Sequence, residues 1–163
     1  MQLLDRVVSN IHLCGVELSF NSTVVPSNIS GWQPFYNSTF QNYDFQKAYA
    51  SLASINFDEE SNESSSGTSY KQKVTFRFPN SDSQRSNRIN LLGKVKFIKL
   101  KQTNALDIVF GRNDFNQNAR PKMKIKQNEQ ICEVSFETSS IFPSGYTPNL
   151  NAFGLPVFIP LSF

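Results

Sequence analysis

The chain is poor in the residues that most catalytic and metal sites need. Its 163 residues include two cysteines and one histidine, His12. A zinc site needs several Cys or His ligands at characteristic spacings, which these residues do not supply. The chain also lacks a phosphate-binding glycine loop, a paired-glycine dinucleotide motif and a Gly-x-Ser-x-Gly elbow. We therefore expect no catalytic residue, no cofactor and no metal, and a protein that is not an enzyme.

Long apolar runs are missing too, as are the features of an export signal. No stretch of about 18 apolar residues occurs, which is the length that a membrane-spanning helix needs. Residues 1–6 lack the basic start and the apolar run of a secretory signal. We therefore expect no membrane partner. Cys14 and Cys132 are expected to be free thiols, and the four Asn-x-Ser/Thr sequons to be chance matches.

Positive charge is scarce at both ends of the chain and concentrated in its middle. Residues 1–70 contain two basic and seven acidic groups, and residues 127–163 contain three glutamates with no Lys or Arg. Residues 71–126 contain fourteen basic and three acidic groups. The net charge of +3 therefore conceals segments of −5, +11 and −3. An uneven distribution of this kind indicates a charged partner.

The main pattern that is present is an alternation of apolar and polar residues. In residues 70–78, Tyr70, Val74 and Phe78 would face one way and Lys71 and Lys73 the other, as in a strand. Further strands are predicted over 11–20, 54–57, 95–101 (with a bulge), 106–110, 122–126 and 131–138. A short helix is predicted over 81–93, capped by Asp82 or Ser83. The expected fold is mainly β: a β-sandwich or small barrel of seven or eight strands with one short helix.

Three segments depart from this alternation within the single domain expected over 1–163. Residues 21–46 combine Pro, Gly, Asn and Ser with six aromatics, which favours an extended N-terminal arm. Residues 58–69 are acidic and small, which predicts a solvated loop. Residues 141–163 end in an apolar stretch without charge, which predicts a second extended arm. That stretch must be covered, either by its own domain or by a neighbouring molecule.

The basic middle of the chain supplies the candidate interface. Lys71, Lys73 and Arg77 would share one strand face, and Lys122, Lys124 and Lys126 another. If these strands are neighbours, their outward faces form one basic sheet surface, to which Lys94, Lys96, Lys99 and Lys101 add further charge. That surface is a solvated polar face, a contact for acidic parts of neighbouring copies, or a contact for nucleic-acid phosphates. The strand aromatics would face the core, which disfavours nucleic-acid binding.

Two further groups complete the candidate interface. Arg112 and Arg120 lie in the polar segment 110–121, where each has the fork geometry that binds carboxylate or phosphate. The alternative is a loop held by Asx turns at its Asn and Asp residues. The apolar end contributes three aromatic residues: Phe153, Phe158 and Phe163.

A family resemblance adds to this interpretation. The run from Gly67 to Pro79 is followed by a helix with Leu91-Leu92, a strand with Phe97-Ile98-Lys99-Leu100, and a turn into Ile108-Val109-Phe110-Gly111. Over roughly residues 55–138, this order resembles small neck and tail proteins of tailed phages, especially crAss-like and related phages of Bacteroidota. The resemblance implies a sandwich-plus-helix fold like that of tail tube and tail terminator proteins. It also implies a ring subunit located in the virion, after synthesis in the host cytoplasm.

The expected function is therefore a structural virion subunit of a homo-oligomeric ring in a phage neck or tail. Its partners would be copies of itself and other virion proteins. Two different functions remain open at this point. Residues 32–45 are rich in Trp, Tyr and Phe, which suits a module that binds carbohydrate or a host surface. The basic sheet surface would suit a protein that contacts nucleic acid.

Overall fold

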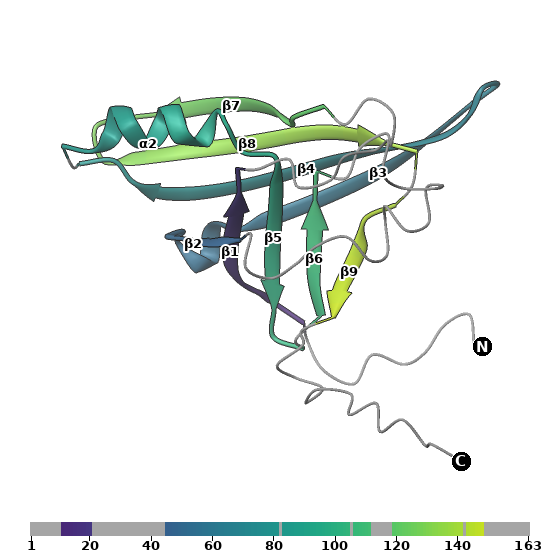
Figure 1. The fold of residues 1–163 in the computed structure, drawn as a ribbon, viewed down its shortest axis with the longest axis horizontal. Helices are drawn as coiled ribbons and strands as arrows, with labels where there is room; N and C mark the ends of the chain where they lie inside the picture. Colours follow the sequence, from purple (N-terminus) through teal and green to yellow (C-terminus); the bar gives the residue numbers. More distant parts are fainter. Residues whose placement is uncertain are drawn as a thin grey trace, which may run out of the picture.

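The computed structural model describes residues 11–20, 45–81, 83–104, 106–111, 119–141 and 143–148. These residues form two antiparallel sheets whose strands run crosswise, with one α-helix at one end (Figure 1). The five-stranded sheet has the order β2-β1-β5-β6-β9, and the four-stranded sheet has the order β3-β4-β8-β7. The expected mainly β fold, a β-sandwich with one short helix, is confirmed.

The elements have the following bounds. The five-stranded sheet contains β1 (Leu13–Ser19), β2 (Gln46–Ala48), β5 (Phe97–Gln102), β6 (Leu106–Phe110) and β9 (Gly145–Pro148). The four-stranded sheet contains β3 (Asn56–Ser64), β4 (Gly67–Pro79), β7 (Lys122–Gln127) and β8 (Ile131–Ser140). A 3-10 turn, η3 (Leu52–Ser54), precedes β3, and the helix α2 (Arg85–Leu92) follows β4.

The core lies between the two sheets, and the alternation in β4, β7 and β8 determines which of their residues enter it. Val74, Phe76 and Phe78 on β4 face inward and are 5% exposed or less. The rings of Phe76 and Phe136, on neighbouring strands, lie 6.1 Å apart. The opposite sheet contributes the buried side chains Val16, Leu18, Ile98, Leu100 and Phe110. Burying a side chain of this size stabilises the fold by about 1.5–3 kcal/mol.

The prediction of an acidic loop over 58–69 is wrong. Its residues form most of a β-hairpin, in which β3 pairs with β4 from Asn56↔Thr75 to Ser64↔Gly67. Ser65 and Ser66 form the tight turn, and Gly67 follows with φ +118°, a backbone conformation that glycine adopts without strain. Backbone pairing with β4 holds these polar residues extended, although every residue from Asp58 to Ser69 is exposed. The hairpin tip projects beyond the rest of the sandwich (Figure 1).

Two smaller expectations also change. Residues 97–100 form a regular part of β5, and all four are buried. The adjacent apolar residues Phe97 and Ile98 therefore reflect burial on both faces of the sheet, and the bulge lies in β1, between Leu13 and Gly15. Helix α2 ends at Gly93 as expected, but its N-cap is Gln84, with no side-chain cap hydrogen bond.

Parts of the two predicted arms and one candidate loop lie outside the described residues. Of the N-terminal arm, 21–44 is not described, and its last residue, Gln46, begins β2. Of the C-terminal arm, 145–148 forms the edge strand β9, and 149–163 is not described. Candidate residues Arg112, Phe153, Phe158 and Phe163 fall in the undescribed ranges.

Candidate assembly interface

The outer face of the four-stranded sheet holds most of the predicted interface residues. Lys71, Lys73 and Arg77 lie on this face of β4, because the residues between them point into the core. Lys122, Lys124 and Lys126 lie on the same face of β7, opposite the inward-facing Met123 and Ile125. The sequence pattern thus located both basic rows on solvent-facing positions.

The two basic rows are not neighbours, so the expectation of one continuous basic surface is wrong. Strand β8 lies between β4 and β7 and places Glu133 and Glu137 on the same outer face. Glu133 is the register partner of Arg77 on one side and of Lys126 on the other. Glu137 is similarly flanked by Lys73 and Lys122. An acidic row therefore separates the two basic rows.

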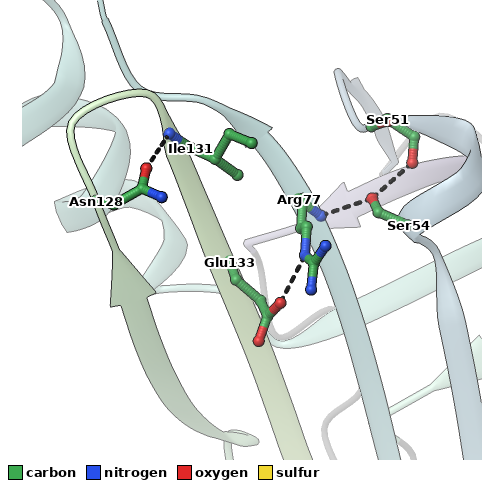
Figure 2. A network of polar contacts seen from close by, with 6 residues as sticks. All are labelled: Ser51, Ser54, Arg77, Asn128, Ile131 and Glu133. Atoms are coloured by element: carbon green, nitrogen blue, oxygen red, sulfur yellow. Dashed lines mark hydrogen bonds and ion pairs between the residues drawn. The ribbon is translucent and has the colours of Figure 1, made fainter.

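Close contacts join these rows. The Arg77 guanidinium donates from Nε to Glu133 Oε2 at 2.6 Å, and Figure 2 shows the two side chains pointing toward one another across β4 and β8. Lys124 Nζ lies 3.6 Å from Glu137 Oε1. The Arg77 backbone is fixed as well, because its N–H donates to Ser54 Oγ at 2.9 Å (Figure 2). Two ion pairs thus join the acidic residues of β8 to the basic residues of β4 and β7.

Strand β3 adds a second acidic row at the far edge of the sheet. Asp58 is the register partner of Lys73, and Glu60 is the register partner of Lys71. Across the sheet, from β3 through β4 and β8 to β7, one line of register partners is Asp58, Lys73, Glu137 and Lys122. The four strands therefore alternate acidic, basic, acidic and basic.

As a result, the two edges of this sheet carry opposite charges. The β3 edge has Asp58, Glu59, Glu60 and Glu63, and the β7 edge has three lysines. Within the described residues, Asp58, Glu60, Lys122 and Lys126 take part in no ion pair closer than 4.0 Å. We call the outward-facing Asp58 and Glu60 the acidic edge, and Lys122, Lys124 and Lys126 the basic edge.

Glu59 has a different role from its neighbours on β3. It faces the other side of the hairpin, where Gln72 Nε2 donates to its Oε2 at 2.9 Å. The backbone N–H of Ser144, just before β9, donates to the same oxygen at 2.8 Å. Glu59 therefore ties the base of the hairpin to the other sheet, while Asp58 and Glu60 remain exposed on the outer face.

The side chains of Arg120, which is exposed, and Lys96, which is buried, donate hydrogen bonds to backbone carbonyls of the same chain. Arg120 donates from Nη1 to the backbone oxygens of Lys94 and, at 3.3 Å, of Phe20. The Lys96 side chain is 1% exposed, and its Nζ donates to the Ala119 carbonyl at 2.7 Å. Burial, together with the nearby charge of Arg120, lowers the pKa of Lys96 to about 8. The expectation that Lys96 adds to an exposed basic surface is therefore wrong.

The five-stranded sheet holds a buried charge cluster that sequence reasoning missed. Lys99 Nζ lies 2.6 Å from Glu17 Oε2, and the two side chains are 4% and 9% exposed. Lys101 Nζ lies 3.7 Å from Glu17 and 3.8 Å from Asp107. Burial raises the pKa of Asp107, and the nearby Lys101 partly opposes this. The sequence pattern that could have predicted this cluster is the alternation of these charged residues with core residues on β1, β5 and β6.

The remaining features of the described residues give no stronger site. An apolar groove of about 430 Å³ opens between the sheets beside α2 and is lined by Leu18, Phe76, Phe78, Leu92 and others, with Arg88 as its charged member. The thiols of Cys14, exposed, and Cys132, buried, are both free. No group of three or more His, Cys, Asp or Glu side chains in the described ranges is placed to hold a metal ion. None of the described helices is long and apolar enough to cross a membrane.

No protein-family model, curated protein sequence or solved structure matches this chain. The geometry of the charged sheet is therefore the observation that bears on function.

Proposed function

We propose that this protein is a structural subunit that assembles head to tail with copies of itself. The observation that supports this is the opposite charge on the two edges of one sheet. Two unlike surfaces on one molecule form a heterologous contact, which generates rings when the rotation between copies closes and filaments when it does not. Complementary charges steer the unlike surfaces together and make like surfaces repel.

The proposed setting is a ring in the neck or tail of a phage virion. Its support is the resemblance of residues 55–138 to small proteins of that group. The fold adds no support for the two alternative functions, nucleic-acid binding and carbohydrate binding. Nucleic-acid binding required one basic surface, and Glu133 and Glu137 interrupt it. Carbohydrate binding depends on residues 32–45, nearly all of which lie outside the described residues.

The proposal predicts that assembly depends on salt. At low ionic strength, mass photometry of the purified chain is expected to show oligomers with masses at multiples of 18.5 kDa. At about 1 M salt, where the screening length falls to about 3 Å, the oligomers are expected to dissociate. Mass spectrometry of purified virions is expected to detect the chain as a stoichiometric component.

Two results together would overturn the proposal. The first is a monomer at every salt and protein concentration tested. The second is the absence of the chain from purified virions. Oligomers in solution without the chain in virions would retain the self-assembly and reject the phage setting.

A further inference from the structure

We infer that neighbouring copies join by β-strand addition, with β3 of one copy pairing antiparallel with β7 of the next. This inference rests on the proposed self-assembly and adds the geometry of the contact. Both strands are edges of the four-stranded sheet, as the described residues define it. One side of each strand is therefore left without a strand partner in the sheet, and exposed strand edges of this kind are templates for pairing with another chain.

Strand direction fits this contact. Each neighbouring pair in the sheet is antiparallel, namely β3 with β4, β4 with β8, and β8 with β7. After three reversals, β3 and β7 run in opposite directions. A second copy placed beside β7 in the same orientation therefore brings its β3 alongside as an antiparallel neighbour. The antiparallel order continues from copy to copy without a break.

The charge pattern continues as well. Across one copy, the outer face reads Asp58, Lys73, Glu137, Lys122. Beyond Lys122, the next strand would be β3 of the second copy, which carries the acidic edge. Lysines of the basic edge then face Asp58 and Glu60 of the neighbour, as the lysines of β4 do within one copy. Opposite charges in directly facing cross-strand positions stabilise a strand pair.

The same charges disfavour the other edge contacts. Pairing β3 with β3 would place Asp58 and Glu60 of two copies against one another, and pairing β7 with β7 would bring two sets of lysines together. Like charges that face one another across strands are destabilising. Of the three ways to join the edges of this sheet, the unlike pairing is the one that the charges favour.

Hydrogen–deuterium exchange of the assembled full chain tests the contact. Peptides covering 56–64 and 122–127 are expected to exchange at least about tenfold more slowly in the oligomer than in the monomer, which corresponds to about 1.4 kcal/mol of added protection. Peptides covering β2, an edge of the other sheet, are expected to exchange equally in both states. The monomer reference is the variant Lys122→Glu/Lys124→Glu, whose core peptides must exchange as in the unmodified chain.

A matched control separates this contact from a general effect of charge. Arg85→Glu/Lys94→Glu makes the same change in net charge at two exposed positions outside the sheet. It is expected to assemble and to show the same protection of β3 and β7. Asp58→Lys/Glu60→Lys provides a second monomer reference, from the opposite edge.

The outcomes separate the contact from the proposed function. Oligomers without protection of β3 and β7 would overturn strand addition and leave self-assembly standing. Oligomers formed by both edge variants would likewise place the contact elsewhere. A chain that remains monomeric under every condition would overturn strand addition. If that chain were also absent from purified virions, the proposed function would be overturned with it.

Discussion

The two sheets of this protein use the same kinds of charged residue in different ways. In the five-stranded sheet, Lys99 and Glu17 form an ion pair with side chains only 4% and 9% exposed. In the four-stranded sheet, Lys124 pairs with Glu137 at 3.6 Å, and the lysine side chain is 72% exposed. Buried charges are expensive to leave unpaired, whereas exposed pairs contribute little to stability. The charges of one sheet therefore support the fold, and those of the other are available to a partner.

The largest expected effect on stability comes from breaking the buried pair. Glu17→Gln removes the carboxylate that lies 2.6 Å from Lys99 and 3.7 Å from Lys101. Loss of one partner from a buried ion pair costs about 3–5 kcal/mol. We expect a decrease of this size in the free energy of unfolding, measured by urea denaturation.

The matched substitution in the other sheet is Glu133→Gln. Its partner Arg77 is 57% exposed at the side chain, so the expected loss is at most about 1 kcal/mol. Equal losses from Glu17→Gln and Glu133→Gln would contradict the distinction between the two sheets.

A smaller effect on the free energy of unfolding is expected from Asp107→Asn, and its size changes predictably with pH. Burial raises its pKa above the ordinary 3.8, so the charged form lowers the stability of the folded state. The stability that Asp107 contributes is fully present below pH 3.8 and is lost as the pH rises through its raised pKa. At pH 7, Asp107→Asn should therefore be at least as stable as the unmodified chain, by up to about 1 kcal/mol.

Urea denaturation at several pH values checks this prediction. The advantage of Asp107→Asn should shrink as the pH falls toward 3.8, because Asp107 of the unmodified chain takes up its proton. A variant that is clearly less stable at pH 7, with a loss that decreases in acid, would show that the carboxylate is favourable as an ion.

Much of the fold follows from local sequence. The alternation in 70–78 and 131–138 located β4 and β8, and the helix before Gly93 was found in place. The acidic stretch 58–69 was wrongly predicted as a loop, because the extended backbone of Asp58 and Glu60 depends on a partner strand that lies further along the chain. Asp58 and Glu60 are held extended by pairing with Lys73 and Lys71, more than ten positions away in the chain. Their own composition favours a loop, and the partner strand overrides it.

The candidate interface shows the same limit. The basic positions on β4 and β7 were predicted correctly, because strand period alone determines which residues face outward. The order of strands in the sheet depends on long-range pairing, and it places Glu133 and Glu137 between the two basic rows. Burial of Lys96 and Lys99 was missed for a similar reason, since lysine is rarely fully buried and nothing in its immediate neighbourhood indicates a partner.

The most direct test of head-to-tail assembly mixes two edge variants that carry opposite changes. Lys122→Glu/Lys124→Glu has carboxylates on both edges, and Asp58→Lys/Glu60→Lys has lysines on both. Sedimentation velocity at low salt is expected to show each variant alone as a monomer, because its edges repel. An equimolar mixture is expected to assemble, because every contact between unlike variants restores opposite charges. A mixture that stays monomeric, or either variant assembling alone, would contradict the account.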